Sequence, residues 1–270
     1  MNKKKRFNKI IKDIKTIKIQ GARNIAKAAL YAYSLFPTKA SEKKLLSSRP
    51  TEPMLKKVLV LTEKKPYKEI LQHFKISQNK INKEVSKLIK NNDVIFTHCH
   101  STNVVNALIY AKKHRKKFQV YNTETRPLFQ GRKTALELRK KRIKVTMFID
   151  SALNVALSGK QGAKKTSKVF LGADALLKNG IINKIGSGMI SELAYSKIPL
   201  YIIADSWKFT DEKIHLEQRK LNEIWNKAPK GIKIKNPAFE FVNKKYITRI
   251  VTEFGLMKYE EFVRKMKKEK

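Results

Sequence analysis

Two side chains that can carry out acid–base chemistry each follow a short apolar run of the kind that forms a buried strand. Cys99 is the only cysteine in the 270 residues. It follows the run 94–96 within Thr97-His98-Cys99-His100-Ser101, and Asp174 follows the run 169–171. Ligands of open α/β sheets bind at the carboxyl ends of parallel strands. A thiol and a carboxylate at two such ends are therefore a suitable pair for moving protons on a small molecule.

Each of these residues also has a simpler interpretation. A buried, unreactive cysteine is common, and an aspartate in the setting of Asp174 is also typical of a helix N-cap or a turn. Strand alternation predicts that His98 and His100 point away from the face used by Cys99. Neighbouring residues on a strand cannot converge on one tetrahedral ion, and no second Cys or His pair has a suitable spacing, so we expect no metal site.

Several residues near the predicted strand ends are candidates for phosphate binding. The turn 183–188 opens a helix, where backbone N–H groups and the side chain of Lys184 favour an anion. A plain helix start explains this turn equally well. Arg49 and Arg126 each precede a proline, and Arg132 lies near a helix start. Guanidinium groups suit phosphate oxygens, although a single arginine more often forms a surface ion pair.

The apolar periodicity divides the chain into a helical first part and an alternating second part. From Asp93 onward, short apolar runs alternate with helical segments, as in βαβ units of a mostly parallel sheet covered on both faces. We predict an α/β fold with an N-terminal helical domain (1–92) and a C-terminal Rossmann-like, doubly wound domain (93–270).

The individual elements follow from the same periodicity. In the first part, helices are predicted over 6–18 and 22–36, and one or two more over 67–91. Another begins after the loop 48–53 with Thr51 as its N-cap. The predicted strands are 93–97, 118–121, 144–149, 168–171 and 199–204, with 239–242 and 247–251 as candidates for a late strand. The predicted helices of the second part are 102–113, 130–141, 150–158, 187–197, 212–228 and 258–268.

The composition limits the compartment and the partners. The chain has 61 Lys plus Arg against 22 Asp plus Glu, a formal net charge of +39, which is typical of nucleic-acid binders. The excess is spread along the whole chain and no nucleic-acid-binding motif accompanies it, so we expect a solvated lysine surface that binds polyanions only non-specifically. A single cysteine fits a reducing compartment. Without a secretory signal or a membrane-length apolar run, we expect a cytoplasmic protein.

Motifs spread over nearly the whole chain resemble those of the translation initiation factor 2B alpha, beta and delta subunits. The superfamily also contains methylthioribose-1-phosphate isomerase and archaeal ribose-1,5-bisphosphate isomerase, and SRPT and THCHS are most similar to the latter. The matching stretches are GARNIAKAA (21–29), SRPTEP (48–53), THCHS (97–101), ETRPLFQGRKTALEL (124–138), VTMFIDSA (145–152), FLGADALLKNGIINKIGS (170–187), IPLYIIADSWKF (198–209) and NPAFEFV with YITRIVTEFG (236–255).

The resemblance implies an enzyme of archaeal nucleotide salvage (AMP metabolism) that converts ribose 1,5-bisphosphate to ribulose 1,5-bisphosphate. In this aldose–ketose isomerisation Cys99 and Asp174 would be the catalytic acid–base pair. No metal or redox cofactor is implied, and a homo-oligomer, either a dimer or a hexamer, is expected. The residues implied in substrate binding are Gly21, Arg49, Ser101, Arg126, Arg132, Asn183 and Lys184.

Three departures from the family pattern keep other functions open. Gln20 stands where the isomerases usually have arginine, Glu52 stands where a small apolar residue is usual, and Ser187 replaces a threonine. The alternatives are a non-catalytic regulatory subunit that binds nucleotides or sugar phosphates, a methylthioribose-1-phosphate isomerase, and a charge-driven RNA-associated protein. The last would lose its affinity steeply with salt.

Overall fold

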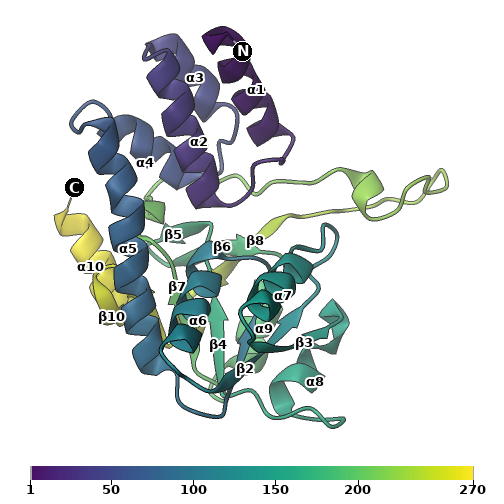
Figure 1. The fold of residues 1–270 in the computed structure, drawn as a ribbon. Coiled ribbons are helices and arrows are strands. Elements are labelled where there is room, and N and C mark those ends of the chain that lie inside the picture. The colour runs from purple at the N-terminus through teal and green to yellow at the C-terminus, as the bar shows by residue number, and fades with distance from the viewer. Residues whose placement is uncertain (1, 270) are drawn as a thin grey trace.

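The computed structural model describes residues 2–269. A layer of helices lies at the ends of the strands of a large sheet (Figure 1). The layer contains α1 (Lys3–Lys15), α2 (Ala22–Leu35), α3 (Lys39–Leu46), α4 (Pro53–Leu61) and the first half of α5 (Tyr67–Leu88). Their apolar faces, spaced at helical period, form one buried cluster that includes Ile14, Leu30 and Val58. Burial of these faces holds the layer together, because isolated helices of such length are marginal in water.

A seven-stranded sheet forms the second part, and its strand order reverses between β1 and β4. The order is β10-β9-β7-β4-β1-β2-β3, with all neighbours parallel except β10 and β9. This confirms the expected α/β class with a mostly parallel sheet, and a reversal of this kind is where such sheets bind ligands. The strands are β1 (Asp93–Thr97), β2 (Phe118–Thr123), β3 (Lys144–Phe148), β4 (Lys168–Leu171), β7 (Leu200–Ile203), β9 (Arg249–Thr252) and β10 (Gly255–Met257).

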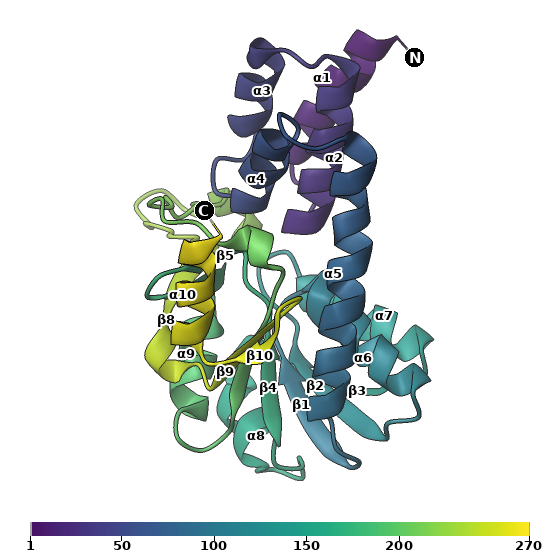
Figure 2. The same ribbon diagram turned by 90° about the vertical axis from the view of Figure 1, so that its left-hand side faces the viewer.

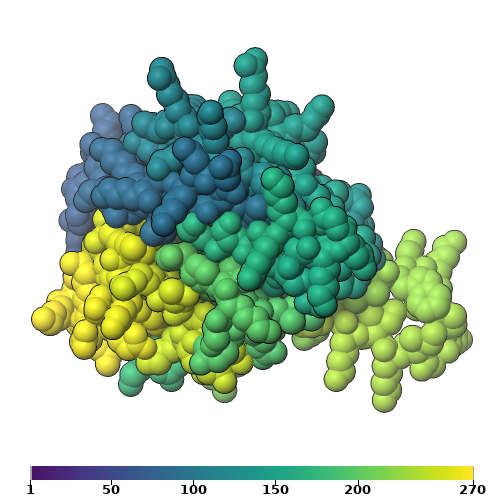
Figure 3. Space-filling view, turned by 90° about the horizontal axis from the view of Figure 1, so that it is seen from below, coloured from purple at the N-terminus to yellow at the C-terminus, as the bar shows by residue number. Residues whose placement is uncertain are grey.

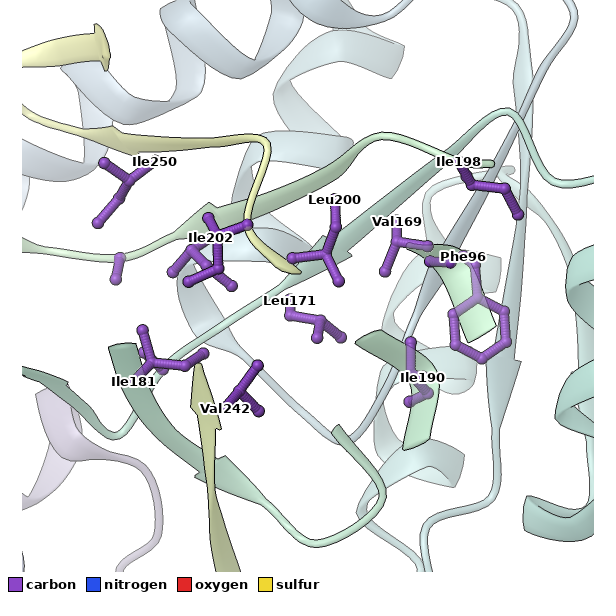
Figure 4. Close-up of a cluster of buried hydrophobic side chains, with 14 of the residues drawn as sticks. Phe96, Val169, Leu171, Ile181, Ile190, Ile198, Leu200, Ile202, Val242 and Ile250 are labelled. Carbon is purple, nitrogen blue, oxygen red and sulfur yellow. The ribbon is translucent and has the colours of Figure 1, made fainter. Parts of the chain in front are cut away.

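Helices cover both faces of this sheet (Figure 2). The second half of α5, α6 (Thr102–Lys113) and α7 (Gln130–Lys140) pack on one face, around Ile95 and Val120. The helices α8 (Leu153–Ser158), α9 (Ser187–Ala194) and α10 (Tyr259–Lys268) pack on the other, around Phe96, Val169 and Ile202 (Figure 4). Alternate residues of β1, β4, β7 and β9 therefore enter different cores, which explains why these strands read as apolar runs.

A small antiparallel sheet, absent from the sequence-based prediction, lies beside the strand ends. It consists of β5 (Ala175–Leu177), β6 (Gly180–Lys184) and β8 (Phe239–Asn243), in the order β5-β6-β8. The segment 239–243 thus forms a strand as expected but pairs with β6 instead of the main sheet. This hairpin carries the chain directly from the end of β4 to Asn183 and Lys184.

Helix α5 belongs to both buried cores. Ile70 and Phe74 enter the cluster of the helical layer, whereas Ile81 and Val85 enter the cluster beneath the main sheet. Between the two, His73 Nε2 lies 3.1 and 3.2 Å from the carboxylate oxygens of Asp205, which follows β7. The unbroken helix α5 therefore connects the helical layer to the ends of the strands (Figure 2).

The helix predicted over 212–228 is wrong. Residues 211–238, here called the arm, form an extended excursion with a single 3₁₀ turn at Leu221–Glu223 (Figure 1) and project from the body (Figure 3). The apolar residues that suggested a helical face find no element to pack against, and Leu221 and Trp225 are each 50% exposed. At its base the arm pairs with itself instead, through Arg219 N–H to the Asn236 carbonyl at 2.8 Å.

Within residues 2–269, no helix combines the length and the apolar character needed to cross a membrane.

Candidate active site

A cavity of about 100 Å³ lies between the helical layer and the carboxyl ends of β1 and β4. Its walls include the start of α2, the loop before α4, the turn between β1 and α6, the loop that follows β4, the end of β6 and the 3₁₀ turn Ser206–Lys208 after β7. The lining residues include Gly21, Arg23, Arg49, Glu52, His98, Cys99, His100, Ser101, Asp174, Asn183, Lys184 and Lys208. The cavity therefore occupies the topological switch point of the sheet.

Cys99 is held in the cavity wall by a strained turn. Strand β1 ends at Thr97, and Cys99 takes a left-handed backbone conformation with φ of 63°, which side chains other than glycine rarely adopt. Its N–H donates to Thr125 Oγ1 at 3.0 Å and its carbonyl accepts from Thr134 Oγ1 at 2.8 Å. Burial, aided by the Asp174 charge and opposed by Lys184, raises the pKa of the thiol to about 11. The group keeps its proton at neutral pH.

The prediction that His98 and His100 point away from Cys99 is wrong, because the strand geometry ends at Thr97 and all three side chains line the cavity. His98 lies with Nε2 2.8 Å from the carbonyl of Ile185 and Nδ1 2.5 Å from Thr123 Oγ1. Burial lowers the pKa of His98, and it lowers that of His100 to about 4. Both rings are neutral, and His98 joins the ends of β1 and β6.

Asp174 reaches the same cavity through a close approach of two backbones. A Cβ atom at Gly172 would lie 2.6 Å from the Cβ of Ser101, so only glycine lets the loop after β4 pass the turn after β1. Asp174 N–H donates to the Ile182 carbonyl at 2.9 Å, which begins the β5–β6 hairpin. Burial raises the pKa of the Asp174 carboxyl, although Lys208 and Lys184 act to lower it.

Asn183 and Lys184 end strand β6 and are both buried at the cavity. The Asn183 side-chain amide donates to Ser187 Oγ at 2.8 Å. Lys184 Nζ lies 5.7 Å from the centre of the Phe239 ring and has no carboxylate partner among the described residues. An unpaired ammonium group in a buried wall is suited to an anionic ligand. Ser101, the N-cap of α6, adds the positive end of that helix.

The helical layer contributes Gly21, Arg23 and Arg49 to the cavity. Gly21 precedes α2 with φ of 82°. Arg23, which sequence reasoning did not single out, donates to Gln78 Oε1 at 3.1 Å, and burial lowers the pKa of its guanidinium. Arg49 is already paired: its Nη2 lies 2.6 Å from Oε2 of Glu217, a residue of the arm.

The predicted site omits two other charged cavity residues, Lys208 and Glu52, the latter noted in the sequence only as a departure from the family pattern. Glu52, not Thr51, is the N-cap of α4, and its side chain makes no cap hydrogen bond but enters the cavity wall. The sequence-based prediction of a loop over 48–53 did not indicate that Glu52 would be the N-cap or that its side chain would enter the cavity wall. Lys208 Nζ donates to the Ala173 carbonyl at 2.5 Å and so holds the loop that carries Asp174. The sequence signal that could have identified Lys208 is the position of a lysine within the mostly apolar stretch 198–209.

Arg126 and Arg132 lie outside this cavity. The backbone N–H of Arg126 donates to Asp150 Oδ2 at 2.7 Å, and its exposed guanidinium borders a separate hollow near α9. Arg132 forms an ion pair with Glu124 at 3.0 Å and stacks on the Phe129 ring. Both follow β2, which lies one strand away from the switch point.

Comparison with known proteins accounts for this architecture. The profile of the initiation factor 2 subunit family matches residues 38–259. The chain belongs to this family. A ribose 1,5-bisphosphate isomerase of Methanocaldococcus jannaschii is 33% identical to it, and the match covers 90% of this chain and 89% of that protein.

Two further proteins are similar to this chain. A putative translation initiation factor eIF-2B subunit 2-like protein of Pyrococcus furiosus is 27% identical, over 92% of this chain and 95% of that protein. The crystal structure of a translation initiation factor eIF-2B of Pyrococcus horikoshii OT3 superposes with a TM-score of 0.81 at 24% identity, covering 94% of this chain and 97% of that one. The likeness to this structure shows the shared fold.

Proposed function

We propose that this protein is an aldose–ketose isomerase that converts ribose 1,5-bisphosphate to ribulose 1,5-bisphosphate. The observation that carries the proposal is that Cys99 and Asp174 follow neighbouring strands at the switch point and line one cavity. The similarity to the Methanocaldococcus jannaschii isomerase over most of both chains supports the choice of substrate.

The reaction needs only groups that exchange protons. The bond between C1 and the ring oxygen breaks, and that oxygen gains a proton. C2 then loses its proton, the C2 hydroxyl becomes a carbonyl, and C1 gains a proton. The carbon that is oxidised and the carbon that is reduced belong to the same sugar, so no external electron acceptor takes part. A thiol that keeps its proton and a carboxyl group of raised pKa form a suitable acid–base pair in a buried site.

The same cavity offers groups for the phosphates and hydroxyls. We assign substrate binding to Gly21, Arg49, Ser101, Asn183 and Lys184. We add Arg23, which lines the same cavity as Gln20, the residue that stands where the isomerases usually have arginine. Lys184 is the strongest candidate for a phosphate because no carboxylate among the described residues neutralises it. Arg126 and Arg132 have no place in this proposal, because neither lines the cavity.

We further propose a homo-oligomer, a dimer or a hexamer, acting in the cytoplasm and contacting nucleic acid only through the general lysine excess. Light scattering coupled to size-exclusion chromatography measures the oligomer directly. Chromatography at low and high salt separates a protein assembly from one bridged by polyanions, because polyanion contacts weaken with salt.

The decisive experiment is to incubate the purified protein with α-ribose 1,5-bisphosphate and to measure the ketose product. We expect turnover that Cys99→Ser reduces by about 10²–10⁴, with ligand binding retained. Methylthioribose 1-phosphate, which has an apolar thioether in place of the second phosphate, should react poorly. Tight binding of the bisphosphate without turnover would instead support a regulatory subunit.

A further inference from the structure

Glu52 is a buried carboxyl group that the proposed chemistry does not use. Glu52 is only 4% exposed and lines the cavity that contains Cys99 and Asp174. Its Oε2 atom is buried and has no hydrogen-bond partner in the described part of the chain. Burying a carboxylate without a partner is costly, so such a group is normally paired or neutral.

The cations near Glu52 are engaged elsewhere. The Arg49 guanidinium holds Glu217 with two contacts, Nη1–Oε1 of 3.1 Å and Nη2–Oε2 of 2.6 Å. Lys208 donates to the carbonyl of Ala173. Both cations still act on Glu52 at longer range, but the Asp174 and Glu217 carboxylates oppose them. Within residues 2–269, a negative charge on Glu52 in addition to that of Asp174 would have no direct counter-ion.

The remaining charged and titratable groups of the cavity complete this account. Lys184 lies on the β6 wall and Arg23 on the α2 wall, whereas Cys99 and the two neutral histidines add no charge near neutral pH. Burial, with the help of Asp174, raises the pKa of Glu52 to about 8. The group is therefore a neutral acid at neutral pH and a carboxylate in mildly alkaline solution.

We propose that Glu52 is a positioning and specificity residue that must carry a proton when the anionic sugar phosphate binds. In this state its O–H is a hydrogen-bond donor in the cavity wall, and the wall presents one negative charge fewer to the phosphates. This inference rests on the proposed function for its ligand. A carboxylic acid kept neutral by its surroundings so that it can donate is an established device of enzyme sites.

The first test is the pH dependence of KM and kcat for the wild type and Glu52→Gln, whose amide imitates the protonated acid. In the wild type, KM should rise about tenfold per pH unit above pH 8 while kcat changes little. In Glu52→Gln, KM should stay flat to pH 9.5. The control Glu63→Gln makes the same change on an exposed residue that pairs with Lys39, and it should follow the wild type. The same alkaline rise in Glu52→Gln would overturn the proposal.

The second test does not depend on turnover, and its first arm does not need the Glu52→Gln variant. Calorimetric titration of Cys99→Ser protein with ribose 1,5-bisphosphate at pH 9, in two buffers of different ionisation enthalpy, measures proton uptake on binding. We expect uptake approaching one proton per site at pH 9, little at pH 6.5, and a loss of most of it when Glu52→Gln is added. No uptake at pH 9, or an uptake that Glu52→Gln leaves intact, refutes the role of Glu52.

The two proposals fail in distinguishable ways. Turnover with a pH profile that is insensitive to Glu52 removes the present inference and leaves the isomerase. Binding with proton uptake but without turnover removes the isomerase and leaves Glu52 as part of a sugar-phosphate binding site. An absence of any binding of ribose 1,5-bisphosphate removes both.

Discussion

The two regions that enclose the cavity contribute different kinds of group. The strand ends provide Cys99 and Asp174, which can exchange protons with a substrate and are fixed by close backbone contacts. The helical layer provides Arg49, which forms an ion pair with Glu217 of the arm, and Glu52, a buried carboxyl group whose ionisation Glu217 and Asp174 oppose. In the proposals above, the strand ends carry out the reaction and the helical layer selects the charge of the ligand.

This difference predicts a separation in kinetics. Groups that act only in the transition state should change kcat, whereas groups that hold the ligand in both states should change KM. Substitutions of the proton-exchanging pair, Cys99 and Asp174, and substitutions of the charged residues that hold the ligand should therefore fall into two classes.

The largest effect is expected for Asp174→Asn. Loss of the exchangeable carboxyl group should lower kcat by about 10²–10⁴ with a much smaller change in KM. Because the Asp174 charge raises the pKa of Cys99, the variant should also react faster with iodoacetamide between pH 7 and 9. A kcat near that of the wild type would break the comparison, and circular dichroism establishes that the variant is folded.

Lys184→Gln tests the charge that no carboxylate among the described residues neutralises. A charged hydrogen bond contributes about 1.5–3 kcal/mol, so we expect KM to rise about 10- to 100-fold while kcat falls less. Lys178→Gln is the matched control, since Lys178 is an exposed lysine in the turn of the same hairpin. Equal losses in both variants would show that the effect is one of general charge, which also predicts strong sensitivity to salt.

Glu52→Gln should stabilise the protein in a pH-dependent way. The folded-state pKa of about 8 exceeds the ordinary value of 4.5, so between these values the folded state binds more protons than the unfolded state. Stability of the wild type therefore falls as pH rises from about 5 to 8, and the variant escapes this loss.

Thermal melting measures this effect. The Tm advantage of Glu52→Gln should be near zero at pH 4.5 and several degrees at pH 8.5, at about 2–4 °C for each kcal/mol. Glu63→Gln should show no such gain, because Lys39 lowers the pKa of Glu63. A constant difference at all pH values would mean that Glu52 does not titrate in this range.

The smallest effect is expected for Arg126→Gln. The side chain borders a separate hollow and its backbone, not its guanidinium, binds Asp150. Both kcat and KM should stay within about twofold of the wild type, in line with most surface substitutions. A large rise in KM would place Arg126 in the substrate site and would extend that site beyond the cavity described above.

The sequence predicted the strand ends well because local signals suffice there. An apolar run that gives way to polar residues marks the end of a parallel strand, and both Cys99 and Asp174 lie just after such runs. Right-handed crossovers then predict a doubly wound sheet. Together these rules place Cys99 and Asp174 at the carboxyl ends of its strands.

The parts that failed depend on contacts between distant segments. The amphipathic pattern of 212–228 predicts a helix, but a helix needs a surface to pack on, and the arm finds none. Glu217 instead reaches back to Arg49 from 168 residues along the chain. Thr51 was the expected N-cap by residue type, and nothing local showed that Glu52 would take that position and turn its side chain inward.

Helix α5 sets the mechanical character of the site. It enters both buried cores without a break, and His73 and Ser77 at its middle contact Asp205 beyond β7. A hinge motion of the helical layer against the main sheet would have to bend α5 or pull its side chains out of one of the two cores. We therefore expect ligands to enter and leave by movement of the arm, which carries Glu217, while the helical layer and the strand ends stay in place.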